Sequence, residues 1–289
     1  FNPAGFVSFY MRIWILSDIH VDFIENRKWL DQLSDFEYQD DLLILAGDVT
    51  HNLDLFKSTL ISLRKKFKML FFVPGNHDLW LRDDLFSDSL EKFHHIQQFC
   101  KSNDIKTSPE LVSNNLVNIL IVPLFTWYHL PHQTDSLYLT KPGEGSYEEM
   151  WNDSYFVKWP SESFKPVEYF LNLNKQQFRS GNADLVITFS HFLARQENMF
   201  SNDGRLDREK MKKFDRNPKF NFSMIAGSKL IDEQLRIMGS KIHVYGHQHI
   251  NHDRIINGVR YVAHCLGYPA ERLRGMIEGI EQGLKQIWP

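Results

Sequence analysis

Residues 69–78 read Met-Leu-Phe-Phe-Val-Pro-Gly-Asn-His-Asp, an apolar run that ends in a polar cluster. An apolar run without alternation predicts a strand that is buried on both faces of its sheet. The cluster behind it offers amide, imidazole and carboxylate groups, which are side chains that bind metal ions. The segment therefore predicts a covered strand with chemically active residues at its carboxyl end.

Apolar runs of the same type recur along the chain. Further predicted strands cover 13–16, 42–46, 116–122, 185–189 and 242–245. Helical apolar spacing occurs over 28–36, 53–67, 88–101, 167–179 and 229–238, with Ser228 and either Ser87 or Asp88 as N-caps. Asn257-Gly258, between 253–256 and 259–263, predicts a two-residue hairpin turn. Strands that alternate with helices predict a layered α/β fold.

Composition excludes several classes of protein. The 289 residues include 33 Lys and Arg against 36 Asp and Glu, so no global basic field favours nucleic acid. Two cysteines, Cys100 and Cys265, form neither a disulfide framework nor a metal-spaced pair, which indicates a reducing compartment. The apolar stretch 116–125 is half a bilayer span and contains Asn118 and Pro123. We therefore expect a cytoplasmic protein without a membrane or nucleic-acid partner.

The domain organisation is expected to be simple. Met11 directly precedes the first predicted strand, so residues 1–10 are interpreted as a tag or an N-terminal extension. Residues 11–289 contain no internal repeat and no interdomain linker, which predicts one domain. Two stretches fit the strand and helix pattern poorly, and we expect lid-like insertions near 129–166 and 194–222.

Polar clusters stand immediately behind five of the apolar runs. They are Asp18-Ile19-His20, Gly47-Asp48, Gly75-Asn76-His77-Asp78, Ser190-His191 and Gly246-His247-Gln248-His249. In an extended segment, residues i and i+2 point to the same side, so Asp18 can act with His20, and His247 with His249. Ligands of α/β sheets gather at the carboxyl ends of strands, so the clusters are expected to converge.

The glycines that precede these polar residues indicate sharp turns and close backbone approach. The candidate ligands are Asp18, His20, Asp48, Asn76, His191, His247 and His249. Seven side chains are too many for one tetrahedral ion and suit two ions that share a carboxylate. A set of oxygen and nitrogen donors without thiolate suits manganese, iron, zinc, cobalt or nickel. The sequence thus predicts two divalent or trivalent transition-metal ions.

The ordered series of these motifs resembles the calcineurin-like metallophosphoesterases over residues 11 to about 264. The resemblance implies a two-layered β-sandwich of mixed sheets flanked by helices. It implies that Asp18, His20 and His249 bind one metal ion. It further implies that Asn76, His191 and His247 bind the other, with Asp48 between the two. By the same resemblance, His77 contacts the substrate phosphate or protonates the leaving group.

A narrower resemblance covers the C-terminal third. The chain is similar there to an uncharacterised subgroup found in plants, algae and bacteria. This likeness rests on 190–195, 227–228, 246–249, 258–262 and 266–272, together with 123–128 and 159–160. One departure from the Ser/Thr protein phosphatases is His51, which stands where those enzymes have an Asp that orients the catalytic His. The orienting partner of His77 therefore cannot be carried over.

These observations predict a metal-dependent phosphoric ester hydrolase with a small phosphorylated substrate. We expect a metal-bridging hydroxide to attack a phosphomonoester or a phosphodiester, and Asn76 and His77 to stabilise the developing charge. Arg195 is a candidate for a second phosphate contact, with a salt bridge as an equal alternative. Alternatives for the whole chain are a nucleotide phosphodiesterase, for cyclic nucleotides or dinucleoside polyphosphates, and a catalytically silent scaffold. Oligomeric state is not predicted.

Overall fold

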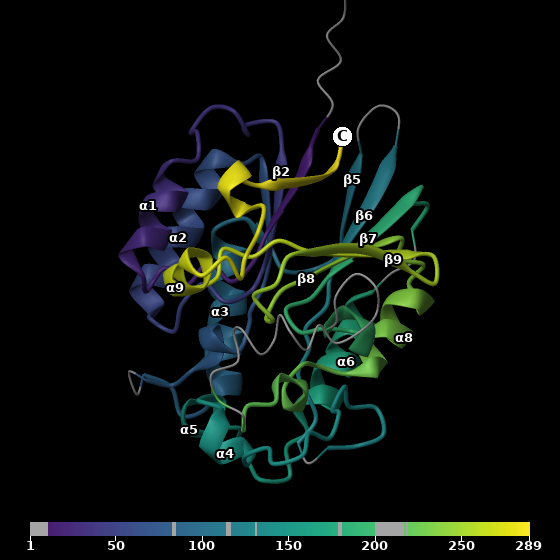
Figure 1. The fold of residues 1–289 in the computed structure, drawn as a ribbon. Coiled ribbons are helices and arrows are strands. Elements are labelled where there is room, and N and C mark those ends of the chain that lie inside the picture. The colour runs from purple at the N-terminus through teal and green to yellow at the C-terminus, as the bar shows by residue number, and fades with distance from the viewer. Residues whose placement is uncertain are drawn as a thin grey trace, which may run out of the picture.

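The computed structural model describes residues 11–82, 85–113, 117–130, 132–178, 181–199, 217 and 219–289. Two mixed β-sheets lie face to face between outer helices (Figure 1). The first sheet has the order β11-β1-β2-β3-β4, with β1 (Ile13–Leu16), β2 (Leu42–Ala46), β3 (Met69–Val73), β4 (Ile105–Lys106) and β11 (Lys285–Trp288). The second has the order β5-β6-β7-β8-β10-β9, with β5 (Glu110–Ser113), β6 (Asn118–Pro123), β7 (Leu185–Phe189), β8 (Ile242–Tyr245), β9 (His252–Ile256) and β10 (Val259–Ala263). The predicted sandwich of mixed sheets is confirmed.

Helices cover the outer face of each sheet (Figure 1). Those on the first sheet are α1 (Ile24–Asp31), α2 (Leu53–Lys66) and α3 (Ser89–Ser102). Those on the second are α6 (Pro166–Gln177) and α8 (Lys229–Ile237). Three short helices, α4 (Tyr147–Met150), α5 (Asp153–Phe156) and α9 (Pro269–Leu273), belong to the connections. The 3₁₀ segments are His77–Leu79, Gln196–Met199, Phe222–Met224 and Ile280–Gln282.

Strand β3 shows why its sequence is apolar throughout. Phe72 contacts Phe56 of α2 at 5.4 Å between ring centroids, so one face of the strand meets a helix. Phe71 points the other way and contacts Phe189 of β7 in the second sheet at 6.4 Å. Alternate side chains of a strand project to opposite faces, and both faces are covered here. Both neighbours of β3, namely β2 and β4, run parallel to it. The runs β1-β2-β3-β4 and β6-β7-β8-β10 are parallel throughout.

Most predicted elements have the expected bounds. The strands at 13–16, 42–46, 69–73, 185–189 and 242–245 agree with the structure, whereas β6 begins at Asn118 and Leu116 lies outside the described residues. Asp88 and Ser228 cap α3 and α8, accepting from the amides of Glu91 and Leu230. The Asn257-Gly258 turn joins the antiparallel strands β9 and β10.

The first helix was predicted at the wrong place. It covers Ile24–Asp31 rather than 28–36, because its inner face carries Asn26 and Leu30. Phe36, which the prediction placed on the apolar face, is 86% exposed beyond the helix end. The buried amide of Asn26 instead donates to the carbonyl groups of Ile19 and Gly267, a polar contact that apolar spacing does not reveal.

The structure describes most of the first predicted insertion but only part of the second. The stretch 129–166 carries α4 and α5 below the sheets in Figure 1. Of 194–222, the part up to 199, residue 217 and the part from 219 onward are described, so the charged run 205–216 lies outside the described residues, as does the extension 1–10. Within the described ranges, no helix has the length and apolar character needed to cross a membrane.

Candidate metal centre

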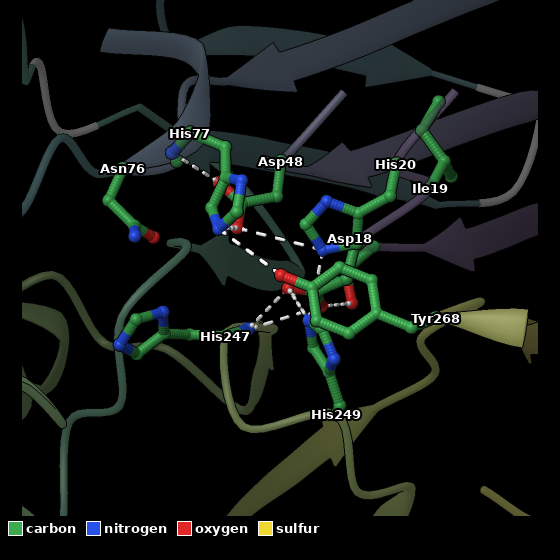
Figure 2. Close-up of polar contacts among 12 residues, drawn as sticks. Asp18, Ile19, His20, Asp48, Asn76, His77, His247, His249 and Tyr268 are labelled. Atoms are coloured by element: carbon green, nitrogen blue, oxygen red, sulfur yellow. Dashed lines mark hydrogen bonds and ion pairs between the residues drawn. The ribbon is translucent and has the colours of Figure 1, made fainter. Parts of the chain in front are cut away.

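The five polar clusters converge where β1, β2, β3, β7 and β8 end. Three of these strands belong to the first sheet and two to the second, so the cluster of side chains lies at the common edge of the sandwich. Figure 2 shows Asp18, His20, Asp48 and His249 directed toward one another, with the ring of His247 on the side of Asn76. Residues up to 231 positions apart in sequence thereby face a common space, as predicted.

One group of potential ligands consists of Asp18, His20 and His249. Their ligand atoms all lie within 4.8 Å of one another. Nε2 of His20 is 3.0 Å from Nε2 of His249, which in turn is 3.4 Å from Oδ1 of Asp18. All three side chains are strongly buried, and two imidazole nitrogens that face each other beside a carboxylate suit a cation between them.

A second group consists of Asp48, His191 and His247, again with ligand atoms within 4.8 Å. Oδ1 of Asp48 is 3.4 Å from Nε2 of His191, and Oδ1 of Asn76 is 3.1 Å from the same nitrogen. The other oxygen of Asp48, Oδ2, faces the first group at 3.9 Å from Nε2 of His20. Asp48 therefore lies between the two groups with one oxygen toward each. The donor types and their spacing fit transition-metal ions.

The backbone that carries these ligands is not extended. Of the residues described, five candidate ligands have a positive φ: Asp18 (50°), His20 (35°), Asp48 (56°), His247 (73°) and His249 (56°). The predicted pairing through an extended backbone is therefore wrong in its geometry, although the paired side chains do converge. Non-glycine residues in the left-handed region are strained, and such strain gathers at functional sites.

A buried carboxylate that is not a candidate ligand holds two of these loops together. Asp78 accepts hydrogen bonds from the backbone N–H groups of Asp48, Val49, Thr50 and Gly75, at 2.8–3.1 Å. Burial and the charge of Asp48 raise the pKa of Asp78 to about 7. Asp78 therefore turns its carboxylate to these N–H groups and does not orient His77.

Close packing explains two of the glycines. A Cβ atom at Gly75 would overlap Oδ1 of Asp48, and one at Gly246 would lie 2.7 Å from Oδ2 of Asp18. Both carboxylates are nearly inaccessible to solvent. The absent side chains leave the space that these carboxylates occupy, which confirms the close approach predicted from the sequence.

The charges of the cluster are strongly coupled. Although burial opposes ionisation of Asp18, its hydrogen bond with His249 lowers the pKa of the carboxyl to about 2. Burial also disfavours a charged His191, yet the adjacent charge of Asp48 raises its pKa to about 9. Burial and the neighbouring His191 lower the pKa of His247 to about 3. The cluster thus combines ionised carboxylates with imidazoles, the usual environment of a bound cation.

Comparison with known families identifies this arrangement. The sequence pattern of the calcineurin-like phosphoesterases matches residues 11–251. The chain belongs to this family. It is a metal-dependent phosphoric ester hydrolase, and its ligand clusters lie within the matched region.

PptH from Mycobacterium tuberculosis narrows the comparison, both by sequence and by structure. The acyl-carrier-protein phosphodiesterase PptH of strain ATCC 25618 / H37Rv is 31% identical over 97 residues, 33% of this chain and 30% of the relative. The crystal structure of phosphopantetheinyl hydrolase (PptH) superposes with a TM-score of 0.74 at 21% identity and covers 98% of both chains. The sequence match spans less than a third of the relative, whereas the fold is shared throughout.

The phosphoesterase site also contains residues that the sequence argument missed. Glu271, in α9, accepts a hydrogen bond from Nδ1 of His249 at 2.7 Å and one from the backbone N–H of Tyr268. The ring of Tyr268 lies over the cluster, with centroids 4.6 Å from His20 and 4.8 Å from His249 (Figure 2). Both residues belong to the narrower resemblance, but they follow no predicted strand, so the strand-end rule could not select them.

His77 lies on the solvent side of the candidate ligands. Its Nε2 is 3.9 Å from Oδ2 of Asp48 and 3.4 Å from the hydroxyl of Tyr268. The ring stacks on Trp80 with centroids 3.7 Å apart. Burial lowers the pKa of His77, so the imidazole is neutral near pH 7.

Arg195 lies in a salt bridge outside the cluster. Its guanidinium contacts Asp232 at 2.7 Å and Glu197 at 2.5 Å. This is the salt bridge that the sequence left as an equal alternative to a phosphate contact. The substrate-binding role of Arg195 stays a prediction, since it requires the guanidinium to exchange these carboxylates for a phosphate.

Proposed function

We propose that this phosphoesterase is a two-metal phosphodiesterase that removes a phosphopantetheinyl group from an acyl carrier protein. The observation that carries the proposal is the convergence of seven candidate ligand side chains in two adjoining groups, with Asp48 facing both groups. The named activity of the relative supports the choice of a phosphodiester and of a protein-linked substrate. In this proposal, a phosphodiester with a protein on one side replaces the initially expected small phosphorylated substrate.

In this proposal, Asp18, His20 and His249 hold one ion, and Asn76, His191 and His247 hold the other. The carboxylate of Asp48 serves both. When bound, such ions lower the pKa of a coordinated water and hold phosphoryl oxygens. The chain contributes fixed donors, because the buried carboxylates are held by backbone N–H groups, as in the bonds from His247 to Asp18 at 2.9 Å and from His77 to Asp48 at 3.0 Å.

His77 is assigned to the leaving group. Its Nε2 lies between Oδ2 of Asp48 and the hydroxyl of Tyr268, on the more exposed side of the cluster. An N–H aimed at the ester oxygen stabilises the negative charge that develops as the P–O bond breaks. The neutral imidazole donates this hydrogen bond to the ester oxygen and keeps its proton.

The nucleotide alternative has less support. Base stacking would need accessible aromatic rings near the cluster, and Trp127 and Tyr128, just before the first insertion, are two candidates. Both are buried, at 3% and 1% exposure, and Trp127 packs edge-on against Trp159. Tyr128 directs its hydroxyl to Asp153 instead of to solvent. The silent-scaffold alternative requires a missing ligand, and all seven are present.

The test is a substrate panel in the presence of Mn²⁺, Ni²⁺ or Zn²⁺. It includes a phosphopantetheinylated acyl carrier protein, bis(p-nitrophenyl) phosphate, p-nitrophenyl phosphate and a cyclic nucleotide. We expect release of the phosphopantetheinyl group and cleavage of the aryl diester, with Asp48→Asn inactive toward both. Cleavage of the monoester alone, or of the cyclic nucleotide alone, would overturn the proposal.

A further inference from the structure

Asp153 connects the first insertion to the metal centre. It begins α5 and is 2% exposed. Its Oδ1 accepts hydrogen bonds from Nδ2 of Asn76 at 2.9 Å and from Nε1 of Trp80 at 2.6 Å. Its Oδ2 accepts from the hydroxyl of Tyr128 at 2.9 Å. A single buried carboxylate therefore contacts a candidate metal ligand and the aromatic residue that stacks on His77.

The contact with Asn76 decides which amide atom faces the cluster. An amide has one oxygen that can bind a cation and one NH₂ group that cannot. Oδ1 of Asp153 accepts its hydrogen bond from Nδ2 of Asn76, so the NH₂ group of Asn76 is turned toward Asp153. The amide oxygen is then directed to the other side, where it lies 3.1 Å from Nε2 of His191. Figure 2 shows the amide of Asn76 beside His77 at the edge of the cluster.

The hydrogen bond between Asp153 and Trp80 affects His77 indirectly, because Trp80 stacks on the His77 ring. The indole ring is stacked on the imidazole with an interplanar angle of 27° and a centroid separation of 3.7 Å. Its N–H group is directed at the same Oδ1 that receives the amide of Asn76. Rotation of the indole would break this hydrogen bond, so the carboxylate also maintains the plane against which His77 rests.

The insertion is anchored at this point. The backbone N–H of Leu81 donates to the carbonyl of Phe156 at 2.7 Å, and the rings of Trp80 and Phe156 are 5.2 Å apart. Helix α5 thus packs on the loop that contains His77 and holds Asp153 in place.

We infer that Asp153 is a positioning residue that orients Asn76 toward a metal ion and His77 toward the substrate. The inference rests on the proposed function, since it takes Asn76 as a ligand. It also supplies the orienting carboxylate of His77 that the sequence left unassigned, through an indole rather than by direct contact. Asp153 lies in the first insertion, 77 residues after Asn76 in the sequence, and belongs to none of the sequence motifs described above.

Asp153→Leu tests this inference, because leucine keeps the approximate volume and removes every acceptor. We expect Mn²⁺ to bind about 10–100-fold more weakly at one of two sites, in line with other losses of an outer contact to a ligand. Asp153→Asn can keep its oxygen toward Asn76 and Trp80 and turn its amide to the hydroxyl of Tyr128. It should retain Mn²⁺ affinity within about threefold. The readouts are Mn²⁺ titration and elemental analysis of the purified protein.

Asp41→Leu is the matched control. Asp41 is also 2% exposed and also accepts from an indole, Nε1 of Trp14 at 2.9 Å, but it precedes β2 at the strand end opposite the metal centre. This variant loses a buried carboxylate without touching a ligand, so its Mn²⁺ affinity should equal that of the wild type. A far-ultraviolet spectrum and a thermal melt of each variant report whether it folds.

A double-mutant cycle separates positioning from general damage. If Asp153 acts on metal binding through Asn76, then Asn76→Ala should weaken Mn²⁺ as Asp153→Leu does, and the double variant should be no worse than Asn76→Ala. Additive losses would overturn the inference, as would wild-type binding by Asp153→Leu or equal losses in Asp153→Leu and Asp153→Asn. Two-site binding without carrier-protein hydrolysis in the wild type would refute the proposed function alone, because binding is measured without substrate.

Discussion

We assign His77 to the substrate side of the metal cluster rather than to its ligands. Its Nε2 lies 3.9 Å from Oδ2 of Asp48, the same distance as Nε2 of His20, but its side chain is more exposed than those of Asp18 and His191. We predict that His77→Ala lowers the turnover of an aryl phosphodiester by about 10²–10³-fold, the usual cost of removing one hydrogen-bond donor from a developing negative charge. The metal content should not change. Turnover and elemental analysis of the same preparation check both parts.

The outcome that contradicts this role is specific. A His77→Ala protein with full turnover shows that the leaving group departs without the imidazole. A protein that loses both turnover and one equivalent of metal shows that His77 is a ligand, as the group His20, Asp48 and His77 would allow. Trp80→Phe keeps an aromatic ring under His77 and serves as the milder comparison.

Glu271 is not a candidate ligand itself, but it contacts His249 of the first ligand group. Its Oε2 accepts from Nδ1 of His249 at 2.7 Å, which leaves Nε2 of that ring directed at Asp18 and His20. We predict that Glu271→Gln weakens metal binding about 10–100-fold, because a carboxylate behind a histidine fixes its orientation and increases its basicity. Titration with Mn²⁺ measures the effect.

Glu91→Gln is a control that separates the effect of Glu271 on His249 from its effect on helix stability. Both glutamates accept a hydrogen bond from a backbone N–H near a helix start, Glu271 from Tyr268 and Glu91 from Ser87. Only Glu271 also contacts a histidine of the cluster. If Glu91→Gln weakened Mn²⁺ binding equally, the loss would reflect helix stability rather than the orientation of His249.

At the scale of the elements, the apolar pattern predicted the strands inside the sheets and missed the partly exposed strands at the sheet edges. The five strands with matching bounds lie inside their sheets and are largely buried on both faces. Strands β4, β5 and β11 lie at sheet edges, have two to four residues and are partly exposed, so no apolar run marks them. Each was recognisable only after its neighbour in the ladder was known.

The same distinction applies to the site. The seven candidate ligands directly follow strands, and the ends of neighbouring parallel strands must meet, so their convergence could be predicted. Asp153, Tyr268 and Glu271 come from connections whose path the sequence pattern does not determine. Their contacts with Asn76, His77 and His249 depend on how two short helices pack, which is a property of the tertiary structure.

Strand β8 contains a histidine with a defined effect on acid stability. His243 is fully buried between Thr188 and Ser190, and burial lowers its pKa to about 3. The unfolded chain has a histidine pKa of about 6.5, so between these values only the unfolded state binds the proton. The contribution of the neutral ring to stability is complete above pH 7 and is lost as the pH falls through 6.5 toward 3.

We therefore predict that His243→Gln reduces the acid sensitivity of the metal-free protein. Between pH 7.5 and 5.5, the wild type should lose about 1.4 kcal/mol more unfolding free energy than the variant, which corresponds to one pKa unit of differential protonation. Denaturant titrations at the two pH values measure this difference. Parallel losses in both proteins would show that His243 is protonated in the folded state.

For the whole molecule, the important feature is that both sheets supply ligands. Asp18, His20, Asp48 and Asn76 follow strands of the first sheet, whereas His191, His247 and His249 follow strands of the second. Each ligand group therefore contains residues from both layers. A bound cation would join the two layers at one edge of the sandwich, in addition to the apolar contacts such as that of Phe71 with Phe189 in its interior.

Chelation should accordingly destabilise the entire fold rather than one loop. An ion present at 100 times its dissociation constant stabilises a folded protein by about 2.7 kcal/mol, because it binds the assembled site and not the unfolded chain. For a chain of this size we predict a fall in Tm of roughly 5–10 °C when Mn²⁺ is replaced by EDTA. Asp48→Asn removes the carboxylate that faces both groups, so its Tm should not respond to EDTA. An equal fall in Asp48→Asn would place the stabilising ion elsewhere, and an unchanged Tm in the wild type would mean that the two sheets are held together without it.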